Sequence, residues 1–104
     1  MMAFWVYLLR CRDGSYYTGH TDELERRLAQ HHAGVFPSCY TANRRPLELV
    51  FTQDVASREE ALVSERRIKG WSRKKKEAMI AGNWPEVSRL AKSVSTKLPG
   101  IVDE

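Results

Sequence analysis

The stretch FWVYLLRCRDGSYYTG, residues 4–19, decides the fold of this chain. Phe4 to Cys11 is rich in aromatic and branched residues, and the same character resumes from Ser15 to Gly19. The three residues between these runs, Arg12-Asp13-Gly14, have the chemistry of a tight turn. The stretch therefore predicts a β-hairpin.

The length of the turn determines which side chains share a face of the hairpin. A two-residue Asp-Gly loop would place Tyr7 and Tyr17 on opposite faces, because side chains alternate along a strand. A three-residue turn closed by a left-handed glycine instead pairs Leu9 with Tyr17 and Tyr7 with Gly19. We favour this register, in which both phenols lie on one exposed face and Gly19 leaves open space beside the Tyr7 ring. The alternative is that these tyrosines are strand formers packed on a core.

Length and composition limit the class of protein. With 104 residues, 42% hydrophobic and 29% charged, the chain is expected to form one small globular domain. It has no run of about 18 apolar residues and no secretory signal pattern at its N-terminus, so we expect a cytoplasmic protein without a membrane span. Cys11 and Cys39 are too few for a disulfide framework or a zinc cluster, and we expect reduced thiols without catalytic importance. A net charge of +4 suits a polyanionic partner.

Two capping boxes, each followed by a glycine stop, predict helices over residues 23–33 and 58–69. The residues concerned are Asp22, Glu25, Gly34, Ser57, Glu60 and Gly70. The apolar run at 47–51 predicts a third strand between these helices.

The rest of the chain is expected to be helical and then irregular. Ser72 can cap a third helix that ends before Gly82, and Asn83 can start a short fourth helix to about Ala91. Residues 92–104 are predicted to be a flexible tail, which leaves a single domain over residues 1–91. The order ββαβααα is typical of an α+β domain, with a small, three-stranded, mostly antiparallel sheet flanked by helices.

Two polar residues lie at the edge of an apolar face in the first predicted helix. At ~100° per residue, Leu24, Leu28 and Val35 share one stripe, and Arg27 and His31 are neighbours beside it. A guanidinium fits a phosphate, and an imidazole can move a proton near neutral pH. The alternatives are a snorkelling surface arginine and a structural histidine.

Glu65 lies inside the apolar stripe of the second predicted helix, which is formed by Ala61, Leu62 and Ile68. A buried glutamate needs either a charged partner or a metal. The structural alternative is a salt bridge to a basic neighbour, Arg27, Arg66 or Lys69. The functional interpretation is a divalent cation such as Mg²⁺, which often uses one carboxylate and completes its shell with water and substrate phosphate.

Basic residues form two groups, Arg44-Arg45 and the run from Arg73 to Lys76. Such groups are usually solvated faces. Both nevertheless flank the predicted site, and Tyr40 and Trp71 could offer stacking surfaces to bases, although packing is the simpler interpretation of Trp71.

Together these features resemble the GIY-YIG nuclease domain, and in particular its compact stand-alone bacterial members. The resemblance covers about Phe4 to Gly82 and depends on the hairpin tyrosines, on Leu24-Glu25-Arg26-Arg27 with His31 one turn further, and on Glu65 in a later helix. The chain departs from the family pattern in Trp5-Val6, in Thr18 and in Lys76-Glu77, which stands near the position of a late family asparagine.

The resemblance assigns roles to individual residues. It implies that Tyr7 matches the tyrosine of the first half-motif, that Tyr17 and Gly19 match the second, and that Glu65 is the metal ligand. The implied catalytic residues are Tyr7, Tyr17, Arg27 and His31, and the expected substrate-binding residues are Gly19, Arg44, Arg45, Lys69, Arg73, Lys75 and Lys76. The implied cofactor is one Mg²⁺ or Mn²⁺ ion, with no small-molecule cofactor.

The resemblance further implies an endonuclease that hydrolyses DNA phosphodiester bonds with low sequence specificity or with a preference for a DNA structure. The expected partner is nucleic acid, with DNA favoured over RNA, and a protein partner is compatible with the sequence. Two alternatives stay open at this point. The chain could be a non-catalytic nucleic-acid-binding module of the same fold that needs a partner for cleavage, or an interaction protein whose aromatic face meets another subunit.

Overall fold

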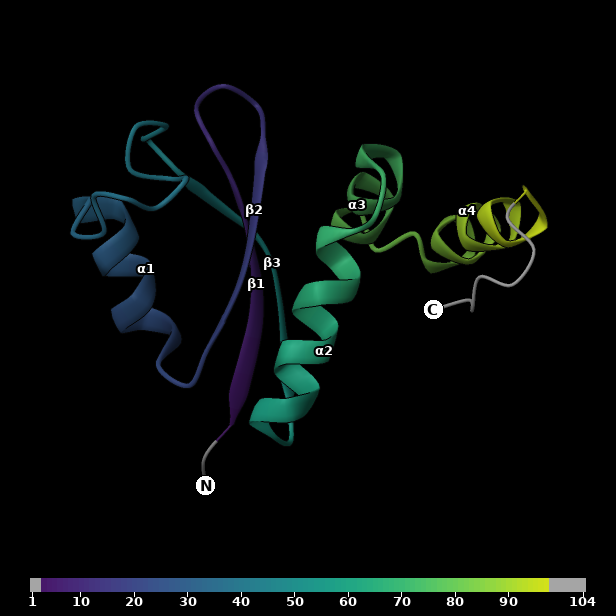
Figure 1. The fold of residues 1–104 in the computed structure, drawn as a ribbon, viewed down its shortest axis with the longest axis horizontal. Coiled ribbons are helices and arrows are strands. Elements are labelled where there is room, and N and C mark those ends of the chain that lie inside the picture. The colour runs from purple at the N-terminus through teal and green to yellow at the C-terminus, as the bar shows by residue number, and fades with distance from the viewer. Residues whose placement is uncertain (1–2, 98–104) are drawn as a thin grey trace. The chain divides into compact units, whose positions relative to one another are not determined.

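The computed structural model describes residues 3–97 of the chain, with side chains up to Leu90. The chain divides into two compact units, Met1–Lys69 and Gly70–Glu104, which are coloured purple to teal and green to yellow in Figure 1. No helix in the described part of the chain is long and apolar enough to cross a membrane.

The first unit is built on a three-stranded antiparallel sheet. Its strands are β1 (Phe4–Arg10), β2 (Tyr16–Thr21) and β3 (Glu48–Val55), in the order β2-β1-β3. The helices α1 (Leu24–Ala33) and α2 (Arg58–Lys69) complete the unit. The predicted sheet is therefore confirmed, and its third strand runs beyond the predicted residues 47–51.

The hairpin has the three-residue turn that the sequence predicts. The Cys11 carbonyl accepts from the Gly14 amide at 2.9 Å, and the Cys11 amide donates to the Ser15 carbonyl at 2.8 Å. Gly14 has a φ of 86°, in the left-handed region that favours glycine. The resulting register pairs Leu9 with Tyr17 and Tyr7 with Gly19, which confirms the expected arrangement of the two phenols.

The two helices of the first unit lie on opposite sides of the sheet (Figure 1). On the α1 side, Tyr7, Leu9, Cys11 and Leu47 form a buried cluster, against which Tyr17, Leu24 and Leu28 pack. The prediction of an exposed tyrosine face is wrong for Tyr7, which is 1% exposed. Val6 and Leu8 alternate with Tyr7 along β1 and face the other side, where α2 packs.

The start of α1 differs from its predicted capping box. Glu23 is the N-cap, without a side-chain cap, and the Glu23 amide donates instead to Thr21 Oγ1 at 3.0 Å. The end of α1 is confirmed, because Gly34 adopts a φ of 71°. Val35 lies beyond this stop and is 53% exposed, so its predicted place in the apolar stripe is wrong.

Serine caps begin two later helices as predicted. Ser57 Oγ accepts from the Glu60 amide at 3.1 Å, and α2 has its predicted bounds. In the second unit, Ser72 Oγ accepts from the Lys75 amide at 3.2 Å and starts α3 (Arg73–Ile80).

The last helix, α4 (Trp84–Lys97), follows Asn83, whose Oδ1 accepts from the Glu86 amide at 3.3 Å. It continues past Ala91, so the predicted short helix is too short. The first residues of the predicted tail are consequently helical, whereas residues 98–104 lie outside the described part of the chain. The domain boundary at residue 91 stays a prediction.

Candidate active site

Tyr7 and His31 form a buried pair on the α1 side of the sheet. The Tyr7 hydroxyl lies 2.9 Å from His31 Nε2. Gly19 makes room for the phenol, because a Cβ at that position would stand 2.5 Å from the Tyr7 hydroxyl oxygen. Burial raises the pKa of Tyr7 to about 12, against the opposing effect of the Arg27 guanidinium. Tyr7 is therefore protonated near neutral pH and needs an acceptor to release its proton.

His31 is oriented to be that acceptor. Its Nδ1 lies 3.0 Å from Thr41 Oγ1, and the Thr41 hydroxyl donates to Cys39 Sγ at 3.4 Å. The Thr41 hydroxyl has one proton and donates it to the sulfur, so its oxygen can only accept from His31. We therefore infer that His31 carries its proton on Nδ1 and accepts a hydrogen bond from Tyr7 at Nε2. Burial, and then Arg27, lower the pKa of His31, which keeps the imidazole neutral near pH 7.

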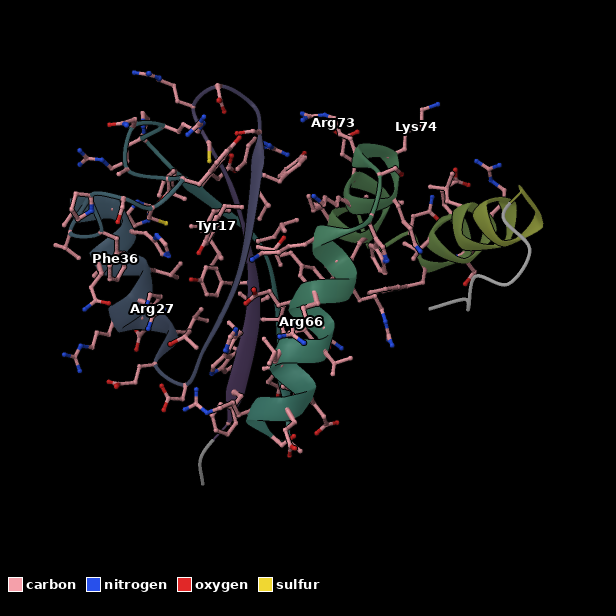
Figure 2. The ribbon with its side chains drawn as sticks, viewed as in Figure 1. Tyr17, Arg27, Phe36, Arg66, Arg73 and Lys74 are labelled. Atoms are coloured by element: carbon pink, nitrogen blue, oxygen red, sulfur yellow. The ribbon has the colours of Figure 1, made fainter. Side chains whose placement is uncertain are left out.

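Tyr17, Arg27 and Phe36 surround this pair on the same side of the sheet (Figure 2). The Tyr17 ring centroid lies 6.4 Å from that of Tyr7 and 5.3 Å from that of His31. The Arg27 guanidinium stands 5.6 Å from the centre of the Phe36 ring. A pocket of about 280 Å³ opens here, lined by Tyr17, Arg27, His31, Phe36, Ser38 and Cys39. It presents a cation, a phenol and an imidazole to one space.

Glu65 belongs to α2, in the buried stripe that the sequence predicts. Its side chain is 12% exposed, with Oε1 2.5 Å from His20 Nδ1 and Oε2 2.8 Å from Lys69 Nζ. Burial alone would raise the pKa of Glu65, but the hydrogen bonds from His20 and Lys69 hold it below its ordinary value. The carboxylate is therefore ionised near neutral pH. Of the predicted salt-bridge partners, Lys69 is the one in place.

The edge strand β2 connects the phenols with this carboxylate. The Tyr7 hydroxyl lies over Gly19, and the next residue, His20, points to the opposite face and binds Glu65. Burial is the main cause of the raised pKa of both Tyr7 and Tyr17, and the Glu65 carboxylate adds a smaller rise to each. The phenols and Glu65 therefore lie on opposite faces of the sheet, next to consecutive residues of its edge strand.

The donor set near Glu65 suits an open cation site. Among the residues that the structure describes, no group of three or more His, Cys, Asp or Glu side chains is placed to hold a metal. An ionised carboxylate is a ligand that Mg²⁺ or Mn²⁺ uses when water and substrate phosphate supply the other ligands. Glu65 has this chemistry, with its two oxygens in contact with His20 and Lys69, and its role as the metal ligand stays a prediction.

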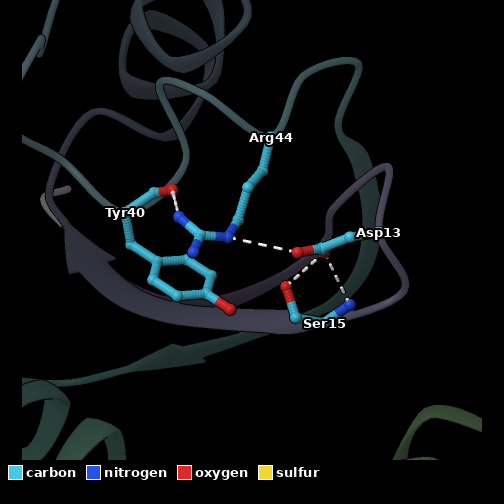
Figure 3. A network of polar contacts seen from close by, with 4 residues as sticks. All are labelled: Asp13, Ser15, Tyr40 and Arg44. Atoms are coloured by element: carbon cyan, nitrogen blue, oxygen red, sulfur yellow. Dashed lines mark hydrogen bonds and ion pairs between the residues drawn. The ribbon is translucent and has the colours of Figure 1, made fainter.

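Arg44 is engaged within the protein, as Figure 3 shows. Its guanidinium stacks on the Tyr40 ring at 3.7 Å from the centroid and donates to the Tyr40 carbonyl at 2.7 Å. Arg44 Nε also donates to Asp13 Oδ2 at 3.2 Å, which ties this loop to the hairpin turn. Arg45 donates to the carbonyl oxygens of Ala42 and His32. Both arginines hold the loop, and their predicted role in substrate binding stays a prediction.

The predicted basic residues of α3 belong to the second unit. Arg73 pairs with Glu77, with 3.0 Å between Nε and Oε2. Lys75 is 5% exposed, and its ammonium lies 4.2 Å from the centre of the Trp71 ring. Burial, and then Arg73, lower the pKa of Lys76. The packed Lys75 and Trp71 are therefore poorly presented for phosphate contact and base stacking, and substrate binding by these residues stays a prediction.

Sequence reasoning did not single out four of the site residues. His20 carried a usable signal, because strand alternation places it on the α2 face beside Gly19. Thr41 and Phe36 carried none, since their contacts depend on the path of a loop. Cys39 is a free thiol, as expected, but it lines the pocket, and hydrogen bonds from Thr41 lower its pKa although burial opposes them.

Comparisons with known proteins found a family match and similar sequences. The GIY-YIG catalytic domain matches residues 3–78. A UPF0213 protein of Bacillus pumilus is 43% identical over 76 residues, covering 73% of this chain and 76% of that protein. A UPF0213 protein of Halobacterium salinarum is 46% identical over 75 residues, covering 72% of this chain and 96% of that protein.

Two solved structures resemble the chain as well. The solution structure of a UPF0213 protein from Bacillus halodurans has a TM-score of 0.51 at 42% identity, and that of a protein from E. faecalis has a TM-score of 0.55 at 39% identity. Each match covers 77% of this chain and 84% of the other. The family match at residues 3–78 spans the hairpin, α1 and the helix that carries Glu65, and the chain belongs to the GIY-YIG catalytic domain family, with small UPF0213 proteins among its relatives.

Proposed function

We propose that this protein is a divalent-metal-dependent endonuclease that hydrolyses phosphodiester bonds of DNA, with low sequence specificity or with a preference for a DNA structure. The observation that carries the proposal is the hydrogen bond from the buried Tyr7 hydroxyl to a neutral His31, beside Arg27 and around the strand edge from an ionised Glu65. Structural packing alone does not require a buried phenol–imidazole pair on one face of an edge strand and an ionised carboxylate on the other.

The proposed chemistry follows from the properties of each side chain. Tyr7, with a pKa of about 12, takes a proton from the attacking water only if it passes its own proton to His31 Nε2. Arg27 faces the pocket and binds the non-bridging oxygens of the scissile phosphate, where negative charge develops. Tyr17, on the same wall, orients the nucleophile. A divalent cation on Glu65 would supply charge stabilisation for the leaving oxygen.

The test is cleavage of single-stranded, duplex and branched DNA, and of RNA, by the purified protein with and without Mg²⁺ or Mn²⁺. Glu65→Gln keeps the size of the side chain but removes the anionic oxygen, so cation binding and cleavage should fall together while the fold survives. Glu59→Gln is the matched control, because it makes the same change at an exposed position of α2. A Glu65→Gln protein that is destabilised but cleaves normally per folded molecule would refute the proposed metal site.

A second candidate function is nucleic-acid binding without cleavage. It is favoured by the contacts of His20 and Lys69 with the two oxygens of Glu65, which compete with a cation for this carboxylate. In that case the same assays would show binding that weakens with salt and no cleavage with either cation.

A further inference from the structure

Two donors of different character hold the Glu65 carboxylate. His20 belongs to the β1–β2 ladder, where it pairs with Val6, and its side chain is 25% exposed. Lys69 is the last residue of α2, with a side chain that is 52% exposed. One donor is therefore a short side chain on a paired strand, and the other is a long side chain at a helix end.

We propose that His20 is the positioning residue of Glu65, and that Lys69 is an exchangeable counter-ion that leaves Oε2 when a divalent cation binds. The inference rests on the proposed function, because it assumes that Glu65 binds a cation. It adds two residues with opposite effects on that binding.

The position of His20 makes it the permanent partner of Glu65. Its Nδ1 lies 2.5 Å from Oε1, and its backbone is fixed by the sheet. A carboxylate oxygen has two acceptor sites, so Oε1 can keep this hydrogen bond while the carboxylate binds an ion. Carboxylates that ligate metals usually accept such a bond, which fixes their orientation and contributes to metal affinity.

The position of Lys69 makes it a competitor of the cation. Its ammonium stands 2.8 Å from Oε2, in space that a cation on this oxygen would need. A cation bound to Oε2 would repel the Lys69 ammonium, because both carry positive charge and would share the same oxygen. The ion pair between Lys69 and Glu65 is weak, because the lysine side chain reaches solvent. Since the lysine stem is flexible, Lys69 can leave Oε2 and contact a substrate phosphate instead, which agrees with the substrate-binding role expected from the sequence.

The test is the affinity of the full chain for Mn²⁺, measured without nucleic acid by electron paramagnetic resonance and calorimetry. His20→Leu should weaken binding about tenfold or more. His20→Asn should stay close to the wild type, because the asparagine amide can donate from nearly the place of Nδ1. Lys69→Met should tighten binding about twofold to fivefold. Arg66→Met is the matched control for charge, since it removes a cation from an exposed neighbouring position on α2.

The outcomes separate this inference from the proposed function. If Glu65→Gln abolishes Mn²⁺ binding but His20→Leu and Lys69→Met leave it unchanged, the cation site stands and the inference is overturned. Weaker binding by Lys69→Met would also overturn it. So would a ¹⁴N coupling to bound Mn²⁺ that disappears in His20→Leu, because His20 would then be a ligand itself. If Glu65→Gln binds Mn²⁺ like the wild type, both the site and the inference fail. Lys69 is exposed, so its variant keeps the test valid even where His20→Leu folds poorly.

Discussion

Replacing Gly19 with alanine tests whether the hairpin register places Tyr7 over this position. A Cβ there would lie 2.5 Å from the hydroxyl oxygen of Tyr7 and 2.6 Å from its Cζ, so the ring must move by about 1 Å to reach ordinary contact. Overpacking of a buried side chain typically costs about 1–3 kcal/mol. Alanine regains about 0.5–1 kcal/mol because it loses less backbone entropy than glycine. The net expectation for Gly19→Ala is a loss of about 0.5–2 kcal/mol in the free energy of unfolding.

The partner substitution at Tyr7 gives this prediction its specificity. Tyr7→Leu removes both contacting atoms, so Gly19→Ala should then stabilise the protein by about 0.5 kcal/mol. Tyr7→Phe keeps Cζ, so in that background Gly19→Ala should still destabilise. For each Tyr7 substitution, urea unfolding at constant m-value gives the free energy of unfolding of the wild type, the two single variants and the double variant. An equal loss of stability in the wild-type and Tyr7→Leu backgrounds would refute the contact, and with it the proposed use of glycine in β2.

Three further predictions concern other parts of the molecule. Burial and Arg27 lower the pKa of His31 below 6.5, so the unfolded chain binds this proton at a higher pH than the folded protein does. The free energy of unfolding should therefore decline below about pH 6.5 in the wild type and decline less in His31→Gln, as urea titrations at several pH values would show. Arg44→Lys keeps the charge but loses the planar contact with the Tyr40 ring and the fork of hydrogen bonds to the Tyr40 carbonyl and to Asp13 of the hairpin turn. Its melting temperature should therefore fall more than that of Arg12→Lys, an exposed turn control. If α3 binds phosphates, neutralising Arg73 and Lys76 should reduce the slope of DNA affinity against salt, and an unchanged slope would remove α3 from the binding surface.

The parts of the fold that local chemistry determines could be predicted from the sequence. The left-handed Gly14 closes a turn within a few residues, and its length sets the register between Tyr7 and Gly19. The bounds of α2 follow from a serine cap at Ser57 and from the glycine after Lys69. These features involve neighbours in the chain, so a single sequence contains what is needed to predict them.

Features that depend on contacts between distant residues could not be predicted in this way. His20 and Glu65 are 45 positions apart, and only the packing of α2 on the sheet brings their side chains together. The burial of Tyr7 has a similar cause, because α1 covers a face that the hairpin alone would leave open. Asp22 does not have its predicted capping role, because α1 begins one residue later with Glu23 at the N-cap, and the capping pattern does not resolve such a shift.

The placement of Gly19 and His20 explains why the turn matters for the site as well as for the fold. These consecutive residues of β2 face opposite sides, so one makes room for Tyr7 and the other reaches Glu65. A slip of one residue in the β1–β2 register would exchange their faces. The imidazole would then stand against the Tyr7 ring, and Glu65 would face a glycine. A turn of three residues is therefore a condition for Gly19 to face Tyr7 and for His20 to reach Glu65, although the turn itself contacts neither Tyr7 nor Glu65.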